Sequence, residues 1–407
     1  MKLKTIRKFF LVLLIIISIK FFTSKIIVGT VWENISWFFL FFILIISLPS
    51  VKFKKTGFSI PVLLISFSIF FSIFMADYSW SQSYFDSIKA TVPYLIWFYF
   101  FYLIKHNIPI SFIEKVIVFY GLLYMLLFFF QFVNSDNIMF GWGEEYDNSR
   151  GVTRIVFPGG GVLYFSLFMS LNKLTTTKSY RYFWLTFLLV GIIVVIMQMT
   201  TQLIFAVVII FSYHILKNNK WDIKILKIVG IICVCLLVVN TNNVLSNGLK
   251  AANEEHLEDG EENIRILSGT YFLTEFSPTN LSRIFGNGIP YGDSTPYGRP
   301  VINLQQELSF HLSDVGLTAV YAMYGIIGVL GFILIWIKSF TIPLPKNYYY
   351  LKYYLWLLLI TCLTSDYIYN YNFLITNVLV LYCYHNVYIR ELNKAPLIKK
   401  ISILKMT

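Results

Sequence analysis

The stretch that decides the fold is FSIPVLLISFSIFFSIFMA, residues 58–76, which contains no charged side chain. A helix needs roughly 20 mostly apolar residues to cross the hydrocarbon core of a bilayer. A backbone in lipid must also satisfy its own hydrogen bonds, and the chain lacks the alternating strands of a closed barrel. The run therefore predicts a transmembrane helix.

Similar apolar runs recur along the whole chain of 407 residues. On the same length criterion they predict an all-α polytopic membrane protein with about 12 transmembrane helices. The pair 182–199 and 202–216 is either a helical hairpin or one interrupted segment. The predicted spans are 9–28, 35–50, 58–76, 88–104, 113–133, 156–172, 182–199, 202–216, 226–245, 313–337, 350–365 and 368–388.

The composition agrees with a membrane protein. Hydrophobic residues make up 57% of the chain and charged residues only 13%, and the mean hydropathy is +0.68. This leaves too little polar surface to cover a water-soluble globule. Lipid must cover much of the molecule instead.

The net charge of +12 would suit a nucleic-acid partner, but the distribution of the charges indicates membrane topology instead. Among the acidic residues, only Glu114, Asp222 and Glu391 lie in the basic segments. With those segments inside, both termini are predicted to be cytoplasmic in a multi-pass protein of the cytoplasmic (inner) membrane, and no nucleic acid is expected. The basic segments are 1–8, 51–57, 105–115, 173–181, 217–227, 338–352 and 389–407.

The topology divides the chain into a membrane domain with about nine spans (1–245), a large extracytoplasmic loop (246–312), and three C-terminal spans with a basic tail (313–407). Polar loops of this length are usually functional or disordered. Within the loop, the spacing of apolar residues over Ile264–Phe276 predicts a short amphipathic helix at the membrane surface.

Arginines on the predicted outer side are the first candidate site. Positive charge is disfavoured in outer loops, and a guanidinium binds phosphate oxygens through two parallel hydrogen bonds. They could therefore bind a diphosphate headgroup, although pairing with the many outer carboxylates is an equally good explanation. These residues are Arg150, Arg154, Arg265, Arg283 and Arg299.

A second cluster comprises Glu307, His311 and Asp314, at the entry to the span 313–337. On one continuous helix their spacing would place all three on the same face. Ionisable residues at a membrane boundary are functional candidates, and His311 could act as a base or bind a phosphate oxygen. The alternative for Asp314, or for Ser313, is helix capping.

Three short motifs resemble those of the O-antigen polymerase and ligase superfamily, which assembles bacterial envelope polysaccharides. They are RIFGNG at 283–288, which follows Arg265 and contains Gly286 and Gly288, FHLSDVG at 310–316, and YGIIG at 324–328. The plan of about 12 spans, with the largest outer loop before the last three, is similar as well. The resemblance covers most of the chain and implies a GT-C-like membrane fold.

The resemblance implies a glycosyltransferase that joins undecaprenyl-diphosphate-linked oligosaccharide repeats into O-antigen, capsule or exopolysaccharide. Because the diphosphate leaves as an anion, positive charge is the main catalytic requirement, and no cofactor and no metal are implied. Arg265 with Arg150 or Arg154 would hold the diphosphate, and His311 would assist proton removal from the acceptor hydroxyl or bind a phosphate oxygen. The bilayer, a chain-length regulator and a flippase are the expected partners.

The chain departs from the family at Thr200-Thr201-Gln202, where many members have Ser-Arg-Gly. No role for a charged side chain is therefore carried over to this position.

An O-antigen-type ligase, which transfers the glycan to another acceptor, is the first alternative function. A transporter or flippase of lipid-linked sugars is the second, although such proteins usually contain interrupted helices and the predicted spans are unbroken. A non-catalytic scaffold is the third.

Overall fold

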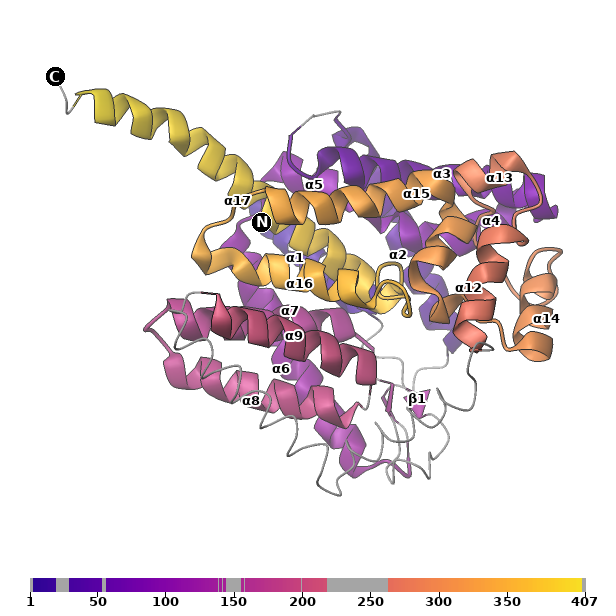
Figure 1. The fold of residues 1–407 in the computed structure, drawn as a ribbon, viewed down its shortest axis with the longest axis horizontal. Helices are drawn as coiled ribbons and strands as arrows, with labels where there is room; N and C mark the ends of the chain where they lie inside the picture. The colour runs from indigo at the N-terminus through magenta and orange to yellow at the C-terminus, as the bar shows by residue number, and fades with distance from the viewer. Residues whose placement is uncertain are drawn as a thin grey trace.

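The computed structural model describes most of the chain. The described residues are 3–19, 29–52, 56–137, 139–140, 142–143, 155–156, 158–198, 200–217 and 263–404. They are almost entirely helical, as predicted (Figure 1). The only strand pairing among them joins β1 (Trp142–Gly143) antiparallel to β2 (Ile155–Val156).

Helices occupy the described part of each predicted span, while residues 20–28 of the first span and all of 226–245 lie outside the described residues. The segments 182–199 and 202–216 form two separate helices that contact each other. The helices are α1 Leu3–Ile19, α2 Gly29–Ser47, η1 Leu48–Ser50, α3 Ser59–Trp80, α4 Tyr84–Thr91, η2 Val92–Phe98, α5 Tyr99–His106, α6 Ile110–Val133, α7 Gly160–Thr176, α8 Arg181–Met197, α9 Thr201–Leu216, α12 Ile264–Thr274, α13 Asn280–Phe285, α14 Gly298–Leu308, η4 Leu312–Asp314, α15 Gly316–Thr341, η5 Lys346–Tyr348, α16 Tyr349–Thr361 and α17 Tyr371–Leu404.

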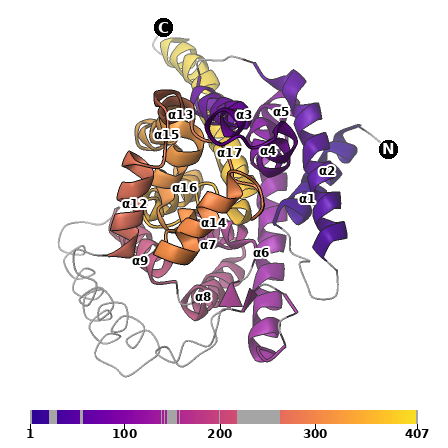
Figure 2. The same ribbon diagram turned by 90° about the vertical axis from the view of Figure 1, so that its right-hand side faces the viewer.

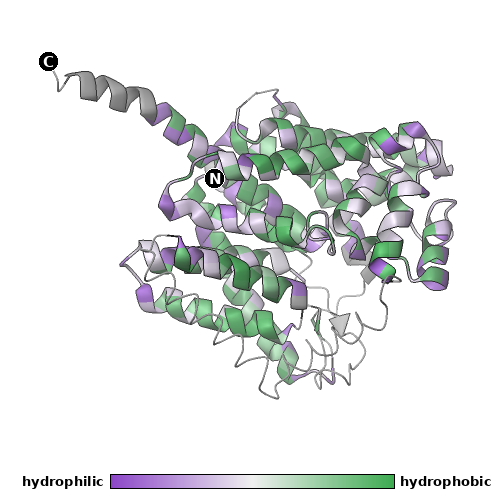
Figure 3. Ribbon diagram, in the orientation of Figure 1, coloured by the Kyte–Doolittle hydropathy of each residue, from purple (hydrophilic) through white to green (hydrophobic). Residues whose placement is uncertain are grey.

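Five helical segments of the described chain are long and apolar enough to cross a membrane, which makes the protein a candidate polytopic membrane protein. Figure 3 shows hydrophobic residues along the middle of the long helices and hydrophilic residues gathered toward their ends. The shorter helices α8 and α9 are also apolar. The five segments are Glu33–Ser50, Ser59–Trp80, Tyr84–His106, Ile110–Val133 and Gly316–Thr341.

Helix α3, which covers residues 59–76 of the predicted span, satisfies the hydroxyls of three buried serines within its own turns. Ser66, Ser68 and Ser72 of α3 each donate to a carbonyl one turn earlier, at 2.7–2.9 Å. Their small side chains also allow α15 to approach closely, with Gly328 facing Ser68 and Gly331 facing Ile65. Small residues at such a contact are typical of helix pairs in membranes.

The segments predicted on opposite sides of the membrane gather at opposite ends of the bundle. At one end Tyr382 donates to the Ile108 carbonyl (2.6 Å), and Lys173 pairs with Glu114 (2.9 Å). At the other end Gln82 donates to the Ile289 carbonyl (3.0 Å). The second end also carries α12, α13 and α14, and is called the capped end below (Figures 1 and 2).

The described part of the predicted large loop is folded. The amphipathic helix predicted over Ile264–Phe276 is present as α12 (Ile264–Thr274); it packs on α15, and its Ser268 and Phe272 are buried. Helix α13 starts with a capping box of Thr279 and Ser282. Residues 263–312 therefore form a compact cap on the ends of α3 and α15.

The prediction of unbroken spans is wrong for α15. Gly325 has non-helical torsion angles (φ 67°, ψ −174°), which open the helix in its first half. The carbonyl of Ala322 accepts from both Asn287 N and Asn287 Nδ2, each at 2.9 Å, and the Met323 carbonyl accepts from Gly288 N at 2.9 Å. The chain between α13 and α14 thus satisfies the carbonyl groups that the break releases.

The span predicted at 88–104 is also irregular. Residues Val92–Phe98 form the 3₁₀ helix η2 between α4 and α5, with Pro93 in its first turn. Proline has no N–H and clashes with the preceding turn of an α-helix. Pro93 and Gly325 therefore interrupt two spans that the sequence predicts to be continuous helices.

We predict that Gly286→Ala destabilises the protein far more than Gly292→Ala. Both glycines have positive φ (86° and 60°), but a Cβ at Gly286 would overlap the Met323 carbonyl, whereas no atom lies within 4 Å of a Cβ at Gly292. The control should lose about 1 kcal/mol from backbone strain alone, and Gly286→Ala clearly more. Thermal unfolding in detergent measures the difference, and equal midpoints would contradict the described packing.

Candidate functional site

The turn between α16 and α17 anchors the capped end of the bundle. The carbonyl of Cys362 accepts from Leu317 N at 2.6 Å, at the start of α15. The hydroxyl of Tyr369 donates to the Leu312 carbonyl at 2.6 Å. These bonds hold the turn against the chain segment that contains His311 and Asp314.

Asp366 lies in this turn, half-buried and held in place by Asn370, whose Nδ2 donates to Asp366 Oδ2 at 2.6 Å. Removal from water raises the pKa of Asp366 to about 6, and the nearby Asp314 carboxylate raises it as well, although the Asn370 hydrogen bond acts in the opposite direction. Tyr94 and Tyr371 lie close enough to interact with its charge. A carboxyl with such a pKa can exchange a proton near neutral pH.

A large cavity of about 770 Å³ opens on one side of this turn. Most of its wall is apolar, with aromatic residues of α2 prominent in it, and Glu33 and Lys89 are its charged members. Tyr94, Tyr291 and Tyr371 add hydroxyl groups. Its lining residues are Ile17, Ser18, Glu33, Asn34, Ser36, Trp37, Phe38, Leu40, Phe41, Phe85, Lys89, Pro93, Tyr94, Ile96, Tyr291, Tyr371 and Leu374.

Lys89 is positioned by rings. Its Nζ lies 4.3 Å from the ring centroid of Phe85 and 5.6 Å from that of Tyr291. Its backbone carbonyl accepts from Trp37 Nε1 at 3.1 Å, which joins α4 to α2. Among the described residues no carboxylate pairs with it, so its charge is available to an anion in the cavity.

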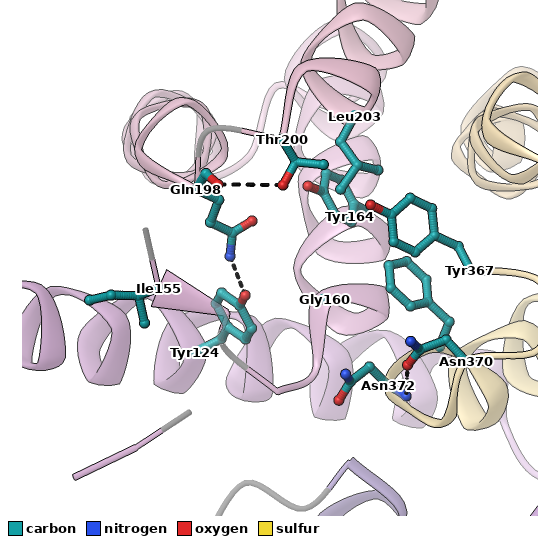
Figure 4. A pocket seen from close by; sticks show the side chains of 11 residues that line it. Tyr124, Ile155, Gly160, Tyr164, Gln198, Thr200, Leu203, Tyr367, Asn370 and Asn372 are labelled. Carbon is teal, nitrogen blue, oxygen red and sulfur yellow. Dashed lines mark hydrogen bonds between the residues drawn. The ribbon is translucent and has the colours of Figure 1, made fainter. Parts of the chain in front are cut away.

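A small cavity of about 120 Å³ lies on the other side of the turn (Figure 4). Amides, hydroxyls and aromatic rings line it. Gln198 Nε2 donates to the Tyr124 hydroxyl, and Gly159 N donates to Asn372 Oδ1 at 3.1 Å. Its lining residues are Tyr124, Ile155, Gly160, Tyr164, Gln198, Thr200, Leu203, Tyr367, Asn370, Asn372 and Phe373.

One stretch of chain separates the two cavities. Asn370 and Asn372 face the small cavity, whereas Tyr371 between them lines the large one. Asp366 is bonded to Asn370 and interacts with Tyr371, so it lies close to both. The 366–372 segment, called the partition below, therefore brings a carboxylate next to a large apolar cavity that contains Lys89 and Glu33, and next to a neutral polar cavity.

The structure corrects the predicted arrangement of Glu307, His311 and Asp314. They do not share one helix face, because α14 ends at Leu308 and Ser309 adopts a left-handed conformation (φ 56°). His311 is extended before η4, and Asp314 N donates to its carbonyl at 3.2 Å. Glu307 is exposed, and Asp314 lies near Asp366. Neither Ser313 nor Asp314 caps α15, which begins after Val315 without a side-chain cap.

The structure describes three of the five predicted arginines, and these three lie on the cap helices. Arg265, Arg283 and Arg299 are all exposed on the cap helices, and none lines either cavity. Arg283 Nη2 donates to the Thr274 carbonyl at 3.4 Å. Arg150 and Arg154 lie outside the described residues.

Gly286 and Gly288 have a backbone role in the structure. Both have positive φ, 86° and 83°, which glycine adopts without strain. They place Asn287 on the break in α15, where Trp80 Nε1 also donates to Asn287 Oδ1 at 3.2 Å. The motif is therefore a structural support behind the site.

Comparison with known proteins identifies no relative: no family model matches the chain, and no curated protein matches it.

The sequence analysis missed Lys89, Asp366 and the small cavity. Asp366 carried a signal, since it is an acidic residue between two predicted spans. Lys89 lies at the start of the predicted span 88–104, where a single lysine does not stand out. The cavity residues are neutral and come from distant parts of the chain, so only the fold brings them together.

Proposed function

We propose that the protein polymerises undecaprenyl-diphosphate-linked oligosaccharide repeats on the outer face of the cytoplasmic membrane. The product would be O-antigen, capsule or exopolysaccharide. The resemblance of the three motifs to O-antigen polymerases and ligases supports this class of reaction.

The observation that carries the proposal is the pair of cavities on either side of the partition. An apolar cavity with a lysine suits a lipid chain that ends in a diphosphate. A neutral cavity rich in amides and hydroxyls suits a polyhydroxyl acceptor. A carboxylate between them suits proton transfer from the acceptor.

In the proposed reaction, a hydroxyl of the acceptor repeat attacks the reducing-end carbon of the donor glycan. The new C–O bond forms as the bond from that carbon to the diphosphate oxygen breaks. Because Asp366 lines neither cavity, the hydroxyl proton passes to it through one water, and the bonding electrons leave with the diphosphate. Lys89 stabilises the departing anion, and the exposed Arg265, Arg283 and Arg299 attract the anionic headgroup to this end.

The charge distribution supports this orientation. Basic residues dominate the opposite end of the bundle, as the positive-inside rule requires of cytoplasmic segments. The capped end would then face outward and both termini inward. About 12 spans would result if 226–245 and the shorter apolar helices also cross the membrane.

The break in α15 bears on the transporter alternative, because transporters use interrupted helices at their binding sites. In transporters, the carbonyls released by the interruption coordinate ions or substrates. Here the carbonyls of Ala322 and Met323 are bonded by Asn287 and Gly288. The break therefore favours a structural role, and the polymerase proposal remains preferable.

The proposal is tested with purified protein and lipid-diphosphate-linked single repeats as the sole substrate. We expect release of undecaprenyl diphosphate and lipid-linked chains of two or more repeats, measured by gel electrophoresis and mass spectrometry. A polymerase uses one molecule as both donor and acceptor. A transporter would make no chains, and a ligase would need a separate acceptor. Chelator should change little, and a requirement for a divalent ion would make Asp314 and Asp366 ligand candidates.

Asp366→Asn should slow chain extension by roughly 10²–10⁴-fold, because an amide cannot accept the hydroxyl proton. Since the base is the ionised form and its pKa is raised to about 6, wild-type activity should fall as pH drops through that value. Asp293→Asn, at an exposed carboxylate, is the control. If His311→Ala abolishes activity and Asp366→Asn does not, His311 is the base, as the sequence alone predicts.

Lys89→Met should lower the turnover rate by about 10²–10³-fold, because the diphosphate loses the cation that stabilises it. Lys178→Met, at an exposed lysine of the opposite end, should have little effect. Arg265→Lys in the same assay tests the sequence-based assignment, since an ammonium cannot replace a bidentate guanidinium. Full activity of Lys89→Met together with a severe defect in Arg265→Lys would move the diphosphate site to α12.

A further inference from the structure

The small cavity contains a buried polar group that the protein leaves unsatisfied. The Tyr164 side chain is 1% exposed, and its hydroxyl has no hydrogen-bond partner among the described residues. Burying a hydroxyl without a partner costs about 1–3 kcal/mol. Figure 4 shows Tyr164 in the wall of the cavity, so a ligand there could supply the missing hydrogen bond.

The other polar groups of the cavity are held in fixed positions. Gln198 is fixed by Tyr124, Asn372 by Gly159, and Thr200 Oγ1 donates to the Gln198 carbonyl at 3.4 Å. Amides offer both donors and acceptors at short separation. Neighbouring hydroxyl groups of one ligand could therefore each find a partner.

Aromatic rings form the apolar part of the wall. The Phe373 ring stacks on Tyr164 with centroids 6.2 Å apart, and lies 4.6 Å from the Tyr367 centroid. The ligand must therefore present both hydroxyl groups and a C–H face, as a sugar ring does. At roughly 30 Å³ per water, the volume of about 120 Å³ holds about four water-sized groups, which is the scale of one hydroxyl-bearing edge of a pyranose.

No charged side chain is present among the described residues that line the cavity. Asp366, which accepts a hydrogen bond from the lining residue Asn370, carries a negative charge when it is ionised. A carboxylate or phosphate on the ligand would lose its water without gaining a cation. The described wall of the cavity therefore offers no cation to an acidic sugar.

We infer that the small cavity is a subsite for the hydroxyl-bearing edge of one uncharged pyranose, which makes the acceptor end of the polymerised repeat a neutral sugar. This inference deepens the proposed function and rests on it for the role of acceptor. The binding of the neutral sugar follows from the cavity alone. It excludes uronic acids and phosphorylated sugars from that position.

The test measures binding of small sugars without any lipid-linked donor. Saturation-transfer NMR on the purified full chain uses methyl glycosides of glucose, galactose, mannose and N-acetylglucosamine, with the methyl uronosides of glucose and galactose as acidic probes. We expect at least one neutral glycoside to bind and both uronosides to fail. Binding of a uronoside as tight as that of its neutral counterpart would overturn the inference, as would the absence of binding by every neutral glycoside.

Tyr164→Phe locates the binding in the cavity. The change removes only a hydroxyl that bonds to no described residue, so the fold should be retained. Affinity for the neutral sugar should fall roughly 2- to 10-fold, the usual value of one hydrogen bond. Tyr99→Phe is the matched control, because Tyr99 is equally buried, its hydroxyl also has no partner among the described residues, and it does not line the cavity. Equal affinity of the two variants would contradict the site.

The two proposals fail separately. Sugar binding that depends on Tyr164, in a protein that makes no polymer from lipid-linked repeats, would overturn the polymerase and keep the neutral-sugar subsite. Polymer formation without such binding would keep the polymerase and overturn the neutral-sugar subsite.

Discussion

A backbone inside a membrane must find its hydrogen-bond partners within the protein, and this constraint governs the capped end of the molecule. The break at Gly325 releases carbonyl groups of α15, and Asn287 and Gly288 bond them. That contact fixes the chain that follows α13 against α3 and α15. Through Gln82, which donates to Ile289 and accepts from Tyr291 N, the same chain then forms one wall of the large cavity.

The helices could be predicted from sequence because the length and apolarity of each one are properties of its own residues. The run at 58–76 predicts α3 directly, since length and apolarity are local properties. The break at Gly325 escaped the prediction because its bonding partners lie far along the chain. An isolated glycine in an apolar run does not reveal whether a helix continues through it. The prediction that Glu307, His311 and Asp314 share one helix face is wrong for a local reason, because the left-handed conformation of Ser309 ends the helix before His311.

The candidate site was less predictable because its residues are ordinary ones in sequence. Arginine stands out in an outer loop, whereas Asn370, Asn372 and Gln198 do not. These residues form a candidate site only because the ends of α8, α9 and α17 meet around one small cavity, and because hydrogen bonds fix the side chains there. Asp366 becomes distinctive only when burial and the neighbouring Asp314 change its acidity.

Along one short stretch of backbone, Asn370 and Asn372 line the small cavity and Tyr371 between them lines the large one. A thermodynamic consequence follows, because any ligand that shifts this backbone from one side also changes the shape offered on the other. Such coupling must be reciprocal. In evolution, a lineage that remodels one cavity for a new sugar would have to compensate in the other, so substrate changes at this partition should be inherited as linked sets of substitutions.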